Sequence, residues 1–387
     1  MQQALETGPG VVELYSGKAV YTEAGQPVFS ILSRNGRQPD AFLKGDAYSA
    51  ATAFIGGEFN VEGDLVRAIQ WRLAQPHSAV RDSLLAFAAK FARLGLTVPS
   101  GSARNIRFHY DRSNRFYETF LDSRMIYSCG YFRSPADSLD EAQAAKLDHI
   151  CRKLHFETHD RFLDIGCGWG GLLFHAADHY GAFATGCTLS RSQFDYVLQK
   201  SAARGDAPDR IRVVESDFQN MQGTFDKIAS VGMFEHVGHR RLRVYFTHVA
   251  GLLSEHGLFL NHAIARPEMV GDGPETLFLQ KYVFPGGDLL HISEVIRAAE
   301  QAGFETLDVE NLRPHYALTC RAWVSRLQAA EEECLQVVTP EVYRTWLLYL
   351  AGCAVSFEGG NTDIYQALFA KRSANQRRPL TRDHIYA

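Results

Sequence analysis

Three short stretches of the chain combine residues that could bind a ligand or transfer protons. The stretch MIYSCGYF (125–132) carries a phenol, a hydroxyl and a thiol in succession, at Tyr127, Ser128 and Cys129. The stretch FLDIGCGWGG (162–171) is rich in glycine and follows an apolar run, and SVGMFEHVG (230–238) places the carboxyl group of Glu235 after another. A thiol cluster ahead of a glycine-rich turn is either ordinary core packing or the edge of an active site.

The glycine-rich turn predicts a nucleotide-type ligand. Gly166, Gly168 and Gly171 fit the pattern G-x-G-x-x-G, in which glycines let the backbone approach the ligand and the following helix N-terminus favours an anionic group. NAD enzymes and S-adenosylmethionine (SAM) enzymes both use this pattern. An NAD site needs an acid about 20 residues further on, but the next apolar run ends in CTLS (187–190) without one. Acids stand instead before the turn, at Asp164, and after the third apolar run, at Asp217. The pattern therefore favours SAM.

From residue 160 onward, apolar runs alternate with helical patterns. Strands are expected at 161–165, 182–189, 211–217, 225–233 and 257–264, and helices at 169–180, 190–205 and 239–253. This alternation predicts an α/β fold with a doubly wound, Rossmann-like parallel sheet. Ligands of such sheets bind beyond the carboxyl ends of the strands.

The N-terminal part has a different pattern. Short strands are expected within 11–33 and 56–64, and helices at 64–74 and 78–95. The stretch VPSGSA (98–103) has turn residues and no periodicity, so we expect a linker there. We predict a smaller α+β domain over 1–97 and a larger domain over 98–387.

Composition narrows the class of protein. The chain has 387 residues, 46% of them hydrophobic and 22% charged, as in soluble globular proteins. Its net charge of −4 without a long basic run argues against nucleic acid as a partner. The seven cysteines form no CxxC pair, which predicts reduced thiols in the cytoplasm and no structural zinc. His175 and His179 could share a helix face, but no third ligand is evident, so no metal is expected. We also expect no secretory signal and no membrane-spanning helix.

Taken together, these motifs resemble the cyclopropane-fatty-acyl-phospholipid synthases and the related mycolic acid cyclopropane synthases and fatty-acid C-methyltransferases. The matching stretches are HYDRSNRFYETFLDSRMIYSCGYF, LDIGCGWGGLL, TLSRSQ, SVGMFEHVG, FLNHAI, KYVFPGG, LRPHYALTCRAW and YLAGCAVSFEGG. The N-terminal part matches more loosely, through FIGGEFNVEGDL. The resemblance implies a class I SAM-dependent methyltransferase fold with a lipid-associated N-terminal domain.

The resemblance also implies a set of SAM-binding residues. They are Tyr127, Ser128, Asp164, Gly166, Gly168, Thr188, Gln193, Asp217 and Phe218. The two glycines would contact the amino-acid end of SAM, Thr188 and Gln193 the ribose, and Phe218 the adenine. Many relatives carry Asp-Tyr-Arg where this chain has Asp217-Phe218-Gln219, and many carry Arg where it has Glu358.

The implied reaction is transfer of a methylene group from SAM to a cis double bond of phospholipid acyl chains. It passes through a carbocation on the chain, which a bound bicarbonate deprotonates. The resemblance assigns the catalytic site to Cys129, Glu235, His262, Tyr316 and the backbone of Ile264. Glu235 would accept the bicarbonate hydroxyl proton, while His262 and Tyr316 donate to its oxygens. Aromatic faces at Tyr131, Phe132 and Tyr282 could stabilise the cation.

The expected substrate implies peripheral binding to the inner face of the cell membrane. We expect the N-terminal domain and an acyl-chain-binding insertion at about 266–290 to meet the bilayer, and we expect a homodimer. One alternative is a fatty-acid C-methyltransferase of the same fold that leaves a methyl or methylene branch. Another is a non-catalytic lipid-binding protein, although the intact glycine turn and Glu235 argue against it.

Overall fold

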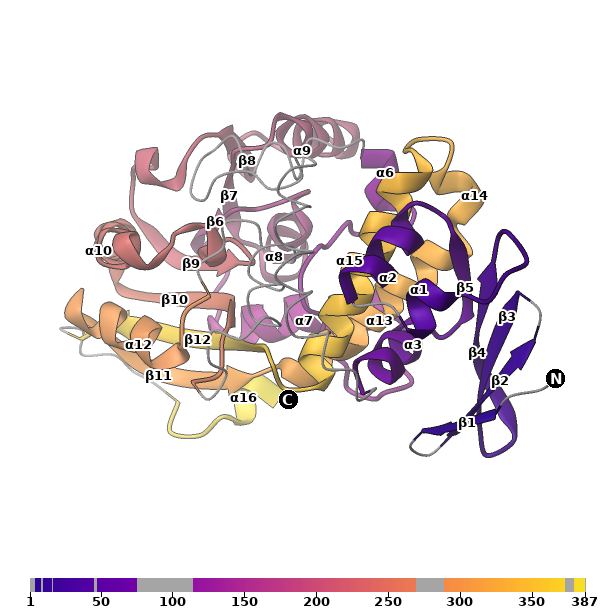
Figure 1. Ribbon diagram of the computed structural model, residues 1–387. Coiled ribbons are helices and arrows are strands. Elements are labelled where there is room, and N and C mark those ends of the chain that lie inside the picture. Colours follow the sequence, from indigo (N-terminus) through magenta and orange to yellow (C-terminus); the bar gives the residue numbers. More distant parts are fainter. Residues whose placement is uncertain are drawn as a thin grey trace. The chain divides into compact units, whose positions relative to one another are not determined.

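The computed structural model describes residues 4–7, 10–15, 17–44, 47–74, 114–268, 289–372 and 379–386 (Figure 1). The described residues form two compact units. One contains the N-terminal residues up to 74 together with Cys320–Gly359, and the other contains 114–268, 289–319 and the described residues from 360 onward. The division falls within helix α13 (Arg313–Ala329).

The larger unit is built on a sheet of seven strands in the order β11-β12-β10-β9-β6-β7-β8. The strands are β6 (Arg161–Ile165), β7 (Phe183–Thr188), β8 (Ile211–Glu215), β9 (Phe225–Val231), β10 (Leu253–Ala265), β11 (Phe304–Asn311) and β12 (Asp363–Lys371). Strands β8, β7, β6, β9 and β10 are parallel, and β12 is antiparallel to both of its neighbours. The predicted doubly wound sheet is confirmed, with an antiparallel strand β12 that the sequence pattern did not predict.

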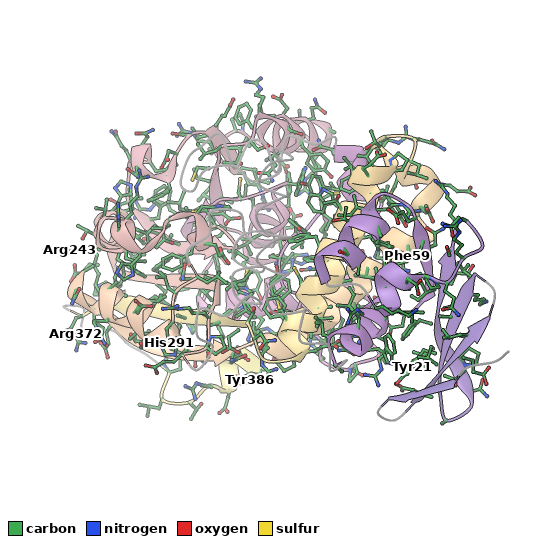
Figure 2. All side chains as sticks on the ribbon, in the orientation of Figure 1. Tyr21, Phe59, Arg243, His291, Arg372 and Tyr386 are labelled. Atoms are coloured by element: carbon green, nitrogen blue, oxygen red, sulfur yellow. The ribbon has the colours of Figure 1, made fainter. Side chains whose placement is uncertain are left out.

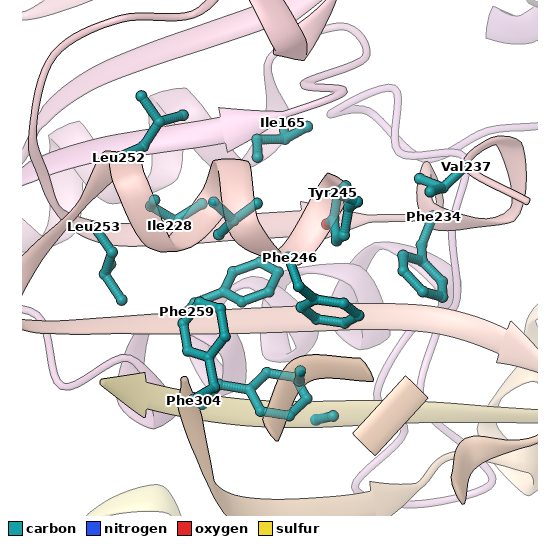
Figure 3. Packing of buried hydrophobic residues seen from close by; sticks show 14 of the residues in the cluster. Ile165, Ile228, Phe234, Val237, Tyr245, Phe246, Leu252, Leu253, Phe259 and Phe304 are labelled. Carbon is teal, nitrogen blue, oxygen red and sulfur yellow. The ribbon is translucent and has the colours of Figure 1, made fainter. Parts of the chain in front are cut away.

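Alternate residues of the strands face two separate cores, as the two-residue period of a strand requires. Phe162, Ala229 and Leu260 point into one core, and their neighbours Leu163, Ile228 and Phe259 point into the other. The first core is covered by α7 (Leu139–Lys153), α8 (Gly171–Tyr180) and α9 (Arg191–Arg204). The second is covered by α10 (Leu242–Leu252) and α12 (Ile292–Gln301), and Figure 3 shows its aromatic packing. Helices on both faces leave the ends of the strands for the site.

This unit also contains several shorter elements. They are α6 (Asn114–Glu118), η1 (Phe218–Asn220), η2 (Phe234–His236), η3 (His239–Arg241) and α16 (Asp383–Tyr386). The 3-10 turns η1 and η2 follow β8 and β9 directly, at the carboxyl ends where ligands of such sheets bind.

The smaller unit contains an antiparallel sheet in the order β1-β2-β3-β4-β5. Its strands are β1 (Ala4–Thr7), β2 (Gly10–Tyr15), β3 (Lys18–Glu23), β4 (Gln26–Ser33) and β5 (Phe59–Gly63). Its helices are α1 (Asp40–Leu43), α2 (Ala47–Ile55), α3 (Leu65–Leu73), α14 (Glu331–Cys334) and α15 (Pro340–Glu358). Aromatic rings fill the N-terminal part of the core, where Phe42 packs between Phe59 and Trp71, and Tyr21 stacks on Phe29 at 4.9 Å; Tyr21 and Phe59 are labelled in Figure 2.

Helix α15 is an integral part of this smaller unit, since it packs against α2 and α3. Glu358, at the end of α15, pairs with Arg321 and accepts a hydrogen bond from Gln70 of α3. Arg321 also pairs with Asp64, the N-cap of α3, at 2.9 Å. These contacts give the glutamate at this position a structural role.

The predicted strands and helix within 11–33 and 56–74 are present. The predicted helix at 78–95, the linker at 98–103 and residues 269–288 of the predicted acyl-chain insertion lie outside the described residues. Within the described part of the chain, no helix is both long enough and apolar enough to cross a membrane. The division into domains at 97 and 98 stays a prediction.

Candidate active site

The glycine-rich turn leaves β6 and is fastened to the end of the neighbouring strand β7. The backbone N–H groups of Gly166 and Cys167 both donate to the carbonyl oxygen of Cys187, at 2.9 and 3.0 Å. Gly166 has φ +80°, and a Cβ there would lie 2.8 Å from the side chain of Met233. Gly168 has φ +55°, and a Cβ there would meet nothing within 4 Å. The turn is therefore packed against protein at Gly166 and faces open space at Gly168.

The predicted ribose-binding residues lie together at the end of β7. Ser190 caps α9 by accepting from the backbone N–H of Gln193, which fixes the first turn of that helix. Gln193 is thereby held beside Thr188, whose hydroxyl donates to its Oε1 at 2.7 Å. Both side chains are buried. A buried hydroxyl and amide in contact can bind a pair of adjacent ligand hydroxyls.

The predicted adenine-binding residues follow β8. Asp217 caps the 3-10 turn η1 by accepting from the backbone N–H of Gln219 at 2.9 Å. Phe218 is half-buried, with its ring edge-on to Tyr245 at 5.3 Å and its carbonyl oxygen 3.0 Å from Nε2 of His248. The aspartate therefore shapes the turn that presents the phenylalanine ring.

The segment Tyr127–Ser128 is held from the side of α7. Tyr127 is half-buried and its ring lies 5.8 Å from that of Tyr117. Ser128 is buried, its carbonyl oxygen accepts from Nε2 of Gln143 at 2.8 Å, and its hydroxyl oxygen accepts from Nζ of Lys146 at 2.9 Å. The carbonyl oxygen and the hydroxyl oxygen of Ser128 are thus both held by side chains of α7.

Cys129 is fully buried and its thiol faces backbone carbonyl groups. Its Sγ lies 3.2 Å from the carbonyl oxygen of Gly130 and 3.8 Å from that of Leu312. Burial raises the pKa of the thiol, so it stays protonated and acts as a weak hydrogen-bond donor. Tyr316 stands one helical turn beyond Leu312, to whose carbonyl its backbone N–H donates at 3.1 Å, and it is half-buried.

Glu235 is a buried carboxyl group on the turn η2 after β9. Its Oε1 accepts from the backbone N–H of Ile264 at 2.7 Å, and its Oε2 has no hydrogen-bond partner among the described residues. Burial raises the pKa of Glu235 to about 7, while the hydrogen bond from Ile264 acts in the opposite direction. The N–H that the resemblance assigns to an anion is already used by Glu235.

His262 lies on β10, two residues before Ile264 and therefore on the same face of the strand. Its Nδ1 is 3.3 Å from Nε2 of Gln366 on the neighbouring strand β12, and its Nε2 has no hydrogen-bond partner in the described part of the chain. Burial lowers the pKa of His262 well below its ordinary value, so the imidazole is neutral. With Nδ1 accepting from the amide of Gln366, Nε2 carries the proton and can donate it.

A series of contacts joins the catalytic candidates. Cys129 touches the carbonyl of Leu312, whose N–H donates to the carbonyl of Ile364 at 2.9 Å. Ile364 is the register partner of Ile264, and Ile264 donates to Glu235. The structure therefore brings residues from four distant segments to one region of the larger unit.

Sequence reasoning missed three buried polar side chains of this region. Gln143 and Lys146 stand one turn apart on α7 and hold Ser128, and Gln366 holds His262. Asp164 is buried as well, and burial raises its pKa to about 7, with Lys146 acting in the opposite direction. The available signal was weak: polar residues at i and i+3 on an otherwise apolar helix stripe.

The remaining residues singled out by the sequence are the aromatic residues expected near the cation and the histidine pair considered as metal ligands. Tyr131 stacks on His149 at 4.2 Å and on His315 at 4.7 Å, which argues against its expected contact with a cation. Phe132 is buried, and Tyr282 lies outside the described residues. His175 contacts Oδ1 of Asp148 at 3.1 Å.

Two features of the arrangement bear on the groups that the resemblance implied. A Cβ at Gly168 would meet nothing within 4 Å, so the turn leaves room there for a ligand. Oε2 of Glu235 and Nε2 of His262 are each buried without a hydrogen-bond partner in the described part of the chain, so each is available to a polar ligand.

Comparison with known proteins agrees with this fold. The sequence model of the family described as "Mycolic acid cyclopropane synthetase" matches residues 99–367. A "Probable fatty acid methyltransferase" from Pseudomonas putida is 40% identical over 350 residues, covering 87% of this chain and 86% of that protein. Cyclopropane mycolic acid synthase 3 from Mycobacterium tuberculosis is 36% identical over 279 residues, covering 69% of this chain and 96% of its own.

Solved structures give the same result. The cyclopropane synthase MmaA2 from Mycobacterium tuberculosis superposes with a TM-score of 0.66 at 33% identity, over 70% of this chain and 99% of that chain. The mycolic acid cyclopropane synthase CmaA1, solved in complex with SAH and CTAB, superposes with a TM-score of 0.66 at 34% identity, with the same coverage of both chains. The chain belongs to the mycolic acid cyclopropane synthetase family of SAM-dependent methyltransferases.

Proposed function

We propose that this enzyme transfers a methylene group from SAM to the cis double bond of phospholipid acyl chains, closing a cyclopropane ring. SAM supplies an electrophilic methyl group, so the protein must align it with the alkene and exclude water. Gly166, Gly168, Thr188 and Gln193 would hold the cofactor at the ends of β6 and β7, and Ser128 would contact it from the segment fixed to α7.

The observation that carries the ring-closing assignment is the pair of unpartnered buried atoms, Oε2 of Glu235 and Nε2 of His262. A buried polar atom without a partner costs free energy, about 1–3 kcal/mol, so a polar ligand that met both atoms would be favoured. We propose that it is bicarbonate, which would supply the base for ring closure. The pKa of Glu235, about 7, lets this carboxyl group hold or release a proton near neutral pH.

The test is expression of the full chain in a bacterial host that lacks cyclopropane lipids, followed by mass spectrometry of its phospholipid acyl chains. The expected result is a gain of one CH₂ with loss of the double bond, and NMR of the product should show ring protons. Removal of carbon dioxide and bicarbonate from an assay of the purified enzyme should slow turnover. An unchanged rate without bicarbonate would rule out bicarbonate as the base.

A second candidate is fatty-acid C-methylation, which leaves a methyl or methylene branch. It is favoured by the 40% identity to a protein named as a probable fatty acid methyltransferase. The same experiment separates the two reactions, because a branched product lacks the ring protons. The choice of phospholipid rather than another acyl carrier would be tested by supplying the purified enzyme with vesicles of unsaturated phospholipid.

We also propose reversible binding to the bilayer surface and assembly as a homodimer. Co-sedimentation with phospholipid vesicles tests the first, and light scattering of the purified chain tests the second. Deletion of residues 1–95 is a poor control, because α15 packs against α2 and α3 and would lose its partners.

A further inference from the structure

Helix α7 carries a buried ammonium group whose place in the reaction is not yet explained. Lys146 is only 2% exposed and lies on the side of α7 that also buries Ala142, Leu147 and Ile150. Lysine is almost never fully buried unless it is paired. Among the described residues, however, Lys146 makes one hydrogen bond, to Ser128, and no ion pair.

The segment around Ser128 is held in place by several contacts. Besides the bonds from Gln143 and Lys146, the backbone N–H of Gly130 donates to Oγ1 of Thr319 at 2.9 Å. The N–H of Tyr131 donates to the carbonyl oxygen of Ala142 on α7 at 2.9 Å. The backbone of this segment is therefore positioned without Lys146, whose own bond is to the serine hydroxyl alone.

The titratable groups that act on Lys146 are two carboxyl groups and a thiol, and Lys146 in turn acts on the buried imidazole of His262. Asp122 already accepts from the backbone N–H groups of Arg124 and Ile126, at 3.0 and 2.8 Å. Asp164 is buried, and Lys146 favours its ionised form. Cys129 is a protonated thiol. Burial lowers the pKa of Lys146 to about 8, an effect that these neighbours only partly offset.

The hydrogen bond from Lys146 fixes the direction in which the hydroxyl group of Ser128 can donate. An ammonium group has three donors and no acceptor, so the serine oxygen must accept and its O–H must point elsewhere, at an acceptor. The amino-acid end of SAM offers two charged groups. Its ammonium group can only donate, whereas its carboxylate can only accept.

We propose that Lys146 is a positioning residue that fixes Ser128 as a hydrogen-bond donor to the carboxylate of SAM and adds a favourable positive charge beside it. The proposal rests on SAM being the methyl donor. It predicts that the enzyme recognises the carboxylate of the cofactor through Ser128, with Lys146 acting through that hydroxyl.

The test is calorimetric titration of the full chain with three ligands: S-adenosylhomocysteine (SAH), decarboxylated SAH and methylthioadenosine. Lys146→Met should weaken SAH binding roughly 10- to 100-fold, the usual value of a hydrogen bond to a charged group. Binding of the two ligands without a carboxylate should be nearly unchanged. Ser128→Ala should give the same ligand-specific loss, and the double variant should lose no more than either single one.

Gln143→Met is the matched control, because it removes a bond to the backbone of Ser128 but leaves its hydroxyl polarity intact. It should not discriminate between SAH and decarboxylated SAH. An equal loss for all three ligands in Lys146→Met, or additive losses in the double variant, would overturn the proposal. If Lys146→Met does not fold, a uniform effect or no effect in Ser128→Ala would still refute the proposal. Failure of the wild-type chain to bind SAH would instead remove the assigned methyl donor.

Discussion

Glu235→Gln should remove most of the turnover and, at the same time, change how the stability of the protein depends on pH. The carboxyl group of Glu235 is 4% exposed, with Oε1 bonded to the backbone N–H of Ile264 and Oε2 without a partner among the described residues. Glutamine keeps the shape and the first contact. It cannot be ionised, so the variant isolates the effect of the proton.

The magnitude follows from the pKa of Glu235, which is about 7 in the folded protein against an ordinary value of 4.5. The folded state binds the proton more tightly, at about 1.36 kcal/mol for each tenfold difference in affinity, or roughly 3 kcal/mol in all. Because the folded pKa is the higher one, this stabilisation is complete below pH 4.5 and is lost as pH rises to 7. Between pH 5 and pH 8 the wild type should lose about 2–3 kcal/mol from this group.

The assay is urea unfolding of wild type and Glu235→Gln at pH 5 and pH 8, at equal ionic strength. The buried amide of the variant lacks a partner and costs about 1–3 kcal/mol, but that cost does not depend on pH and cancels in the comparison. The variant should therefore lose about 2–3 kcal/mol less than the wild type between the two pH values. The comparison requires that the free energy of unfolding depends on urea concentration with the same slope, the m value, in both proteins. Parallel pH dependences would refute the view that Glu235 takes up a proton on folding.

The activity of the same variant tests the catalytic role. Turnover should fall by about 10²–10⁴, as for other lost acid–base groups, while SAH affinity stays nearly unchanged. A variant that stays within a few-fold of wild type would show that Glu235 does not take part in the reaction.

Three further predictions use different parts of the chain. Gly168→Val should abolish SAH binding. Gly205→Val, at another open position with positive φ, is the control: it should cost similar stability, about 1–2 kcal/mol, and leave binding intact. Equal binding by both variants would contradict the assigned cofactor site. Cys129 and the other six cysteines are buried, so none should react with iodoacetamide at pH 8 in the native protein, as mass spectrometry would show; labelling of Cys129 would contradict its raised pKa. Glu358→Arg should destabilise the smaller unit by roughly 1–3 kcal/mol, measured by urea unfolding. Adding Arg321→Glu in the same chain should restore part of the lost stability. Purely additive losses would show that the pair does not interact.

Strong local patterns made much of the larger unit predictable. Strands β6, β7, β9 and β10 are apolar runs followed by helices, and their order in the chain implies which ends carry the ligand. Strand β11 was missed because Glu305, Asp308 and Glu310 interrupt its apolar pattern, as an edge strand tolerates. Its partner β12 could not be recognised without it.

Residue type and position near a strand end singled out Glu235 and His262 as candidates, and their catalytic roles stay predictions. Lys146 and Gln366 could not be found in this way, because the contacts that single them out are with residues 18 and 104 positions away. Long-range contacts also explain why α15 was not expected to pack against α2 and α3. Periodicity describes which face of an element is apolar, but not which distant element covers it.

The N-terminal residues and Cys320–Gly359 form one compact unit. This arrangement restricts how the protein could recombine with its relatives. Cyclopropane mycolic acid synthase 3 aligns with 69% of this chain but along 96% of its own length, so grafting an N-terminal segment onto such a protein is an obvious chimera. A crossover near residue 98 alone would present α2 and α3 to a foreign α15, and Asp64 and Gln70 of the graft would lose their partners Arg321 and Glu358. A functional exchange would need a second crossover that carries residues 320–359 along with the graft. The segments that must be exchanged together are thus separate in the gene although they form one unit in the folded protein.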